Sequence, residues 1–176
     1  MRNLLSGILI LLLAAGPLAA QTSEWKRYKN TSGNFTVLFP GEPTDTENKA
    51  GDGVQSHTLL AKEGTAVYIV VYTAMTSEQT VDDATFQAFK NEVFKELPKC
   101  EAGAEQPASP ALEGYVGHSY RLNCDMQNAK VIIVGNLYWG KHYAYAVMAI
   151  FPASTGEPAA GEKKFSESFA VIGAAR

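Results

Sequence analysis

The stretch VIIVGNLYWGKHYAYAVMAIF, from Val131 to Phe151, decides the fold of this chain. Two runs of β-branched, aromatic and small apolar residues flank Trp139-Gly140-Lys141-His142, which is the pattern of a tight β-hairpin. If Gly140 and Lys141 form a two-residue turn, Trp139 lies opposite His142. The stretch therefore predicts two long antiparallel strands joined by a short turn.

Neither face of the predicted hairpin is polar along its whole length. Side chains alternate between the two faces of a strand, so the pairing assigns each residue to one face. One face would carry Val131, Ile133, Gly135, Ala144, Ala146 and Met148, and the other Ile132, Val134, Asn136, Tyr138, Tyr143, Tyr145 and Val147. We therefore expect the hairpin to lie inside a sheet that is covered on both sides.

The rest of the chain predicts more strands and two helices. Strands are expected over residues 35–39, 54–62, 65–73 and 115–124, where apolar residues alternate or run together. A helix is expected from about Val81 to Leu97 and a short one over about 159–168. The longer helix presents Phe86, Phe89, Val93, Phe94 and Leu97 on one face. This stripe should pack on the small-residue face of the hairpin.

The N-terminus has the pattern of a secretory signal peptide. Arg2 gives a positive start, Leu4 to Leu13 is almost continuously apolar, and small residues follow Gly16-Pro17. Cleavage after Ala20 would remove residues 1–20 and leave a single domain at 21–176, in the periplasm or secreted. The apolar run is shorter than the ~20 residues that a membrane span needs. No membrane span is therefore expected after cleavage.

Composition limits the partners of this domain. Without residues 1–20, 14 Lys and Arg face 18 Asp and Glu, which is a net charge of −4. This mild acidity argues against nucleic acid as a partner and against electrostatic docking on anionic lipid.

Cys100 and Cys124 are the two cysteines of the chain. Export to an oxidising compartment makes a disulfide between them the expected state. The alternative is a metal site that uses both cysteines, which would need histidine or carboxylate partners close by.

No pattern of catalytic or cofactor-binding residues is present. The histidines His57, His118 and His142 are isolated, and no HxH, HExxH or GxSxG motif occurs. His118 and His142 could approach across the sheet and bind a metal with a carboxylate, but a hydrogen-bonded structural role explains them more simply. We therefore expect a protein that is not an enzyme and has no cofactor.

One set of side chains remains as a candidate binding face. Aromatic residues with polar atoms are enriched where proteins contact partners or ligands. The set is Asn136, Tyr138, Trp139, His142, Tyr143 and Tyr145. The simpler interpretation is that the C-terminal helix covers the tyrosines and that they serve packing.

The order of motifs resembles that of the PsbP-like group of small exported bacterial proteins, mostly uncharacterised. The resemblance rests on Trp25, Tyr28 and the segment GNFTVLFPGEP at 33–43, then on the helix, the hairpin and the closing FSESF at 165–169. It implies an α+β fold, in which an antiparallel β-sheet of about six or more strands has helices packed on its faces as an α/β/α sandwich. Relatives include an extrinsic photosystem II subunit and a nuclear Ran-binding protein, and no functional residue of either is matched here.

Two functional hypotheses follow from these observations, and a hydrolase without a recognised motif is a third and weaker one. The first is a non-catalytic accessory module that binds a protein partner in the cell envelope. The second is a periplasmic protein that binds a small ligand or metal, using His118, His142 and the tyrosine face.

Overall fold

The computed structural model describes residues 24–49, 55–95, 97, 99–126, 129–155 and 161–173. The predicted signal peptide at 1–20 lies outside these residues. The elements are β1 (Trp25–Asn30), β2 (Phe35–Pro40), β3 (Thr44–Lys49), β4 (Gln55–Glu63), β5 (Ala66–Ala74), α1 (Asp83–Lys95), β6 (Cys100–Ala102), β7 (Gln106–Pro107), β8 (Tyr115–Met126), β9 (Ala129–Gly140), β10 (Tyr143–Pro152), η2 (Ala153–Thr155), α2 (Gly161–Glu167) and β11 (Ala170–Val171).

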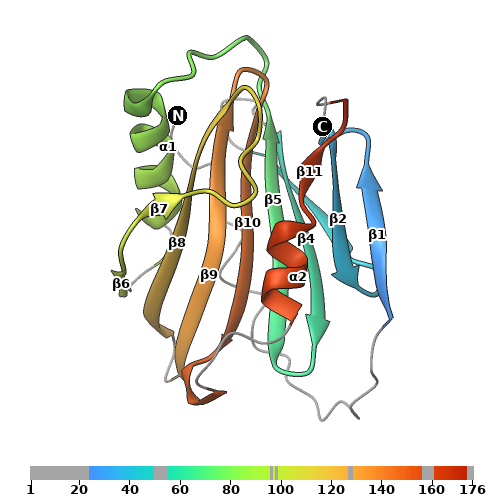
Figure 1. The fold of residues 1–176 in the computed structure, drawn as a ribbon, viewed down its shortest axis with the longest axis vertical. Helices are drawn as coiled ribbons and strands as arrows, with labels where there is room; N and C mark the ends of the chain where they lie inside the picture. Colours follow the sequence, from blue (N-terminus) through green and yellow to red (C-terminus); the bar gives the residue numbers. More distant parts are fainter. Residues whose placement is uncertain are drawn as a thin grey trace.

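The strands form two antiparallel sheets. The large sheet has eight strands in the order β3-β4-β5-β10-β9-β8-β6, with β7 paired to β8 off this path. The small sheet has the order β1-β2-β11. Figure 1 shows α1 beside β8 at one end of the large sheet, with the small sheet at the other side of the molecule and α2 between the sheets. Within the described residues, no helix is long and apolar enough to cross a membrane.

The central hairpin has the predicted faces but a different register. Trp139 pairs with Ala144, and the loop consists of Lys141 and His142. Gly140 stays in the strand because it pairs with Tyr115, whose ring would overlap any Cβ at that position. Trp139 was expected opposite His142 and lies opposite Ala144, two residues further along the chain. Because side chains alternate between the two faces of a strand, a shift of two residues leaves each of them on its predicted face.

The predicted α/β/α arrangement is wrong. A second sheet, not a layer of helices, covers one face of the large sheet, and the protein is a β-rich sandwich. The physical reason lies in β2, where Phe35, Val37 and Phe39 alternate with partly exposed residues and are fully buried. A strand with one apolar face must bury it, and this one packs against the large sheet.

Aromatic rings fill the space between the sheets. Phe169 contacts Phe35, Tyr138 and Tyr145, with ring centroids 5.3, 5.7 and 5.1 Å apart. The buried hydroxyl of Tyr145 donates a hydrogen bond to the Gly33 carbonyl oxygen, 2.8 Å away. Residues from the N-terminal strands, the hairpin and the C-terminal segment thus share one core.

Helix α1 packs on the opposite face of the large sheet. Phe86 and Val93 are buried, and the Phe89 ring lies 5.3 Å from that of Trp139. The helix packs mainly over β9 and β8. It does not sit squarely on the small residues of the hairpin, so Ala144 and Ala146 line an apolar groove beside it.

The cysteine pair agrees with the predicted disulfide. Cys100 on β6 lies directly opposite Cys124 on β8. Their sulfur atoms are at disulfide distance. The competing metal interpretation finds no support, because no group of three or more His, Cys, Asp or Glu in the described part of the chain could hold a metal ion.

Candidate functional site

The predicted binding face is not an exposed surface. Asn136, Tyr138 and Tyr145 do lie together on the face between the sheets, but Tyr138 and Tyr145 are 0% exposed and Asn136 is 3% exposed. Trp139 is buried on the opposite face, beneath α1. The C-terminal segment and the small sheet cover the tyrosines, in agreement with the simpler interpretation.

The buried polar atoms of this set hold neighbouring loops in place. The Tyr138 hydroxyl donates to the Pro110 carbonyl oxygen at 2.8 Å, and Asn136 Nδ2 donates to the Ser109 carbonyl oxygen at 2.9 Å. On the other face, Trp139 Nε1 donates to the Thr80 carbonyl oxygen at 2.8 Å. These hydrogen bonds give the polar atoms of Asn136, Tyr138 and Trp139 partners within the fold. A structural role therefore accounts for these residues without a binding partner.

The remaining two residues of the predicted binding face, Tyr143 and His142, lie at the end of the hairpin. Tyr143 is half-buried, and its ring stacks on that of Tyr145 with centroids 5.9 Å apart. His142 is in the loop, where its side chain is 58% exposed and Nε2 lies 3.6 Å from a Glu78 carboxylate oxygen. The two residues therefore do not join the buried members in one accessible face.

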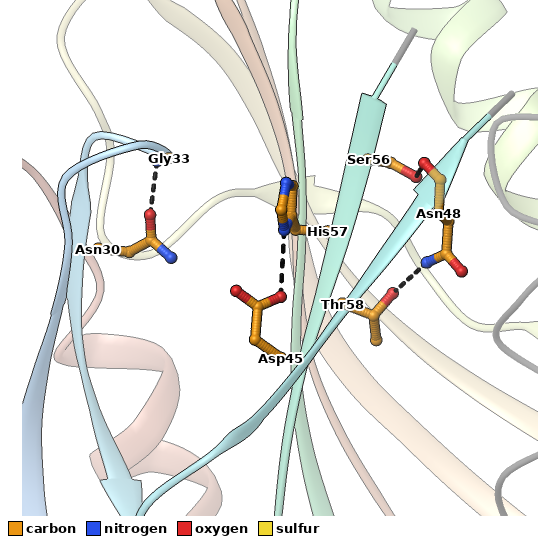
Figure 2. Close-up of polar contacts among 7 residues, drawn as sticks. All are labelled: Asn30, Gly33, Asp45, Asn48, Ser56, His57 and Thr58. Atoms are coloured by element: carbon orange, nitrogen blue, oxygen red, sulfur yellow. Dashed lines mark hydrogen bonds and ion pairs between the residues drawn. The ribbon is translucent and has the colours of Figure 1, made fainter.

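Each histidine of the described chain lies beside one carboxylate. His57 Nδ1 is 3.2 Å from an Asp45 oxygen, and the His57 ring stacks on Tyr72 with centroids 4.8 Å apart. Figure 2 shows this pair on β4 and β3, facing Asn30 of the small sheet across the space between the sheets. Burial raises the pKa of Tyr72 to about 12, with a smaller contribution from the Asp45 charge. The pair links the edge strand β3 to β4.

A second polar cluster attaches α1 to β8. Glu105 accepts a hydrogen bond from Lys90 Nζ at 3.1 Å, and its other carboxylate oxygen lies 2.8 Å from His118 Nδ1. Burial acts to raise the pKa of the Glu105 carboxyl, but the bond from Lys90 and the neighbouring charges lower it on balance. His118 and His142 have separate carboxylate partners, and among the described residues they do not belong to a group of three or more potential ligands that could hold a metal ion.

A cleft of about 690 Å³ lies beside β11, and we call it the interlayer cleft. Residues 110–113 supply one group of its lining residues and residues 167–171 supply another, with Arg27, Thr36 and Gly173 completing it. Ala111 and Leu112 contribute apolar surface, while Arg27, Glu113 and Glu167 contribute charge. A lining of apolar surface with a few charged groups is typical of a binding cleft.

The backbone of β11 borders this cleft. β11 lies at an edge of the small sheet, where it pairs with β2. The Ile172 N–H donates to the Asn34 carbonyl oxygen across this pair at 2.9 Å. Because hydrogen bonding alternates along an antiparallel pair, the N–H and C=O of Val171 point away from β2. Within the described ranges no other strand pairs with β11.

A smaller cavity of about 180 Å³ adjoins the interlayer cleft, and we call it the polar pocket. It shares Glu167 with the cleft, and its Ser109 directly precedes Pro110 of the cleft. Burial raises the pKa of Glu162, and a hydrogen bond from Ser166 offsets part of this effect. The polar side chains of its lining are Ser109, Ser119, Asn136, Glu162, Lys163, Ser166 and Glu167.

Comparison with known proteins identifies no family. No protein-family model matches this chain, and no curated protein matches it. The crystal structure of PA94 from Pseudomonas aeruginosa, a protein of unknown function, aligns with a TM-score of 0.41 and 10% identity over 74% of this chain and 84% of that chain. At that TM-score we draw nothing from the similarity about fold or function.

Sequence reasoning missed both cavities. Their residues come from segments far apart in the chain, and none of these segments carries a recognisable motif. β11 has two residues, which is too short to stand out as a strand. The one usable signal was Phe169, an apolar residue next to the predicted C-terminal helix.

Proposed function

We propose that this protein is an exported, non-catalytic module of the cell envelope that binds an extended segment of a partner protein in the interlayer cleft. The segment adds to the edge of β11 as a further antiparallel or parallel strand. Main-chain hydrogen bonds to an exposed sheet edge are an established way in which proteins bind peptides. This proposal keeps the predicted protein-binding role and moves it away from the buried tyrosine face.

The observation that carries the proposal is the outward backbone of Val171 at the wall of a cleft. An edge strand presents N–H and C=O groups that template pairing with another chain. The cleft volume of about 690 Å³ leaves room for side chains of a bound segment. Apolar surface at Ala111 and Leu112 would pack against apolar side chains of the segment, and the charged groups of the lining would pair with its charged side chains.

Export is supported by the cysteine pair. A disulfide between Cys100 and Cys124 would persist in the periplasm or outside the cell and is uncommon in the cytosol. The kinship with the PsbP-like group stays a prediction from the order of motifs.

The proposal is tested by selecting binders from a displayed library of random linear peptides against the purified mature protein. The affinities of the selected peptides are then measured by fluorescence polarisation for the wild type and for two variants at position 171. Val171→Pro removes the outward N–H and leaves the bonds of β11 to β2 in place, so binding should weaken about tenfold or more, which is ~1.4 kcal/mol. Val171→Thr keeps the N–H and should retain binding.

Two results would overturn the proposal. One is a selection that yields no peptide, and the other is a set of peptides that bind Val171→Pro as tightly as the wild type. A small molecule that raises the melting temperature and competes for the cleft would favour the second hypothesis, a small-ligand-binding protein, since the cleft volume also lies in the usual range of about 300–1,000 Å³ for such sites.

A further inference from the structure

We infer that the polar pocket holds a lysine or arginine side chain of the segment bound in the interlayer cleft. The inference rests on the proposed function, because it concerns the same bound segment. The pocket and the cleft share Glu167 and meet where Ser109 joins Pro110. A side chain that leaves a strand paired with β11 therefore has a route into the pocket.

The charges of the pocket favour a cation. Glu162 and Glu167 contribute two carboxylates to its lining, and Lys163 contributes the one positive charge of the described lining. The Lys163 side chain is 78% exposed, and its Nζ forms an ion pair with Glu167 Oε1 at 3.7 Å. Lys163 therefore offsets the charge of Glu167, and Glu162 is the carboxylate of the lining on which the inference rests. Arg121 acts on Glu162 electrostatically from outside the lining. The other polar side chains are hydroxyls and one amide, which carry no charge.

The hydrogen-bonding capacity of the pocket also favours a donor. The Asn136 amide is already committed, since Nδ2 donates to Ser109 and Oδ1 accepts from Ser119. Glu162, in contrast, accepts one hydrogen bond from the described residues, from Ser166 Oγ at 3.3 Å.

An ionised carboxylate has about four acceptor sites, so Glu162 retains most of its capacity. Ammonium and guanidinium groups supply donors and no acceptors, and they form their strongest hydrogen bonds with partly buried carboxylates. Burial raises the pKa of Glu162, and a bound cation would lower it again.

The test uses the peptides selected on the purified mature protein. We expect lysine or arginine to be enriched at one fixed position among peptides whose binding is lost with Val171→Pro. In a peptide with lysine there, replacement by norleucine keeps the length and removes the charge, and should weaken binding to the wild type about tenfold. The same replacement should change the affinity for Glu162→Gln by less than about twofold.

The control is Glu101→Gln, which removes a carboxylate from the exposed part of β6, away from both cavities. It should show the full preference for lysine over norleucine. Thermal melts of both variants establish that they are folded. Peptides that bind along β11 with no basic position, or with a lysine preference unchanged in Glu162→Gln, would overturn this inference and leave the proposed function standing. Failure to select any peptide would instead overturn the proposed function, and this inference with it.

Discussion

Removal of the Phe169 ring should destabilise the protein more than removal of any partly buried phenylalanine of α1. Phe169 is 1% exposed and contacts three other rings between the sheets. Replacement of such a phenylalanine by alanine typically lowers the free energy of unfolding by 3–5 kcal/mol, because packing is lost and a cavity remains. We therefore expect Phe169→Ala to lose about 4 kcal/mol, a large part of the ~5–15 kcal/mol of a typical domain.

The assay is equilibrium unfolding in urea. Trp25 packs on Tyr68 in the core between the sheets, and Trp139 lies under α1, so their fluorescence reports on both faces of the large sheet. The matched control is Phe94→Ala, since this partly buried ring has one aromatic partner, Tyr120, and should cost roughly 1–2 kcal/mol. If Phe169→Ala costs no more than Phe94→Ala, the C-terminal segment does not close the core as described.

Three further predictions concern other parts of the fold. Replacing Cys100 and Cys124 by serine should lower the free energy of unfolding by roughly 3 kcal/mol, measured in urea, because the unfolded chain loses its cross-link; an unchanged midpoint would contradict a bonded pair. Gly135→Ala places a methyl group against a backbone carbonyl of β10 and should lower that free energy by about 1–3 kcal/mol, whereas a neutral result would mean that the strands can separate there. Burial raises the pKa of Tyr68 and of Tyr72 to about 12, while a tyrosine of the unfolded chain titrates near 10. The contribution of these two tyrosines to stability should therefore be constant below about pH 10 and fall from there to pH 12, because the unfolded state loses its phenolic protons first. The measurement is the free energy of unfolding in urea between about pH 9 and pH 12, and a value that does not fall would contradict the burial of these hydroxyls.

Local pattern was sufficient to predict most elements of this protein. The phenylalanine spacing predicted α1, and the alternation in the hairpin predicted which side chains share a face, because these patterns depend on the periods of 3.6 and 2 residues. The disulfide partner followed from the residue types and the expected compartment. The turn of the hairpin was misplaced because the contact of Gly140 with Tyr115 of another strand is not visible locally.

What covers each face was decided by the tertiary structure alone. The alternating apolar residues of β2 indicate that one face of this strand must be buried. They do not indicate which element covers that face. The sequence left binding open as an alternative to packing for the tyrosines of the hairpin, with packing the simpler interpretation. Contacts with Phe169, from the distant C-terminal segment, bury Tyr138 and Tyr145 in the structure. The interlayer cleft arises where the edge of β11 meets a loop more than fifty residues earlier in the chain, and the polar pocket arises where α2 meets β8 and β9. Such contacts depend on long-range packing, and for that reason the sequence determined the strands and their faces, while the fold determined the site.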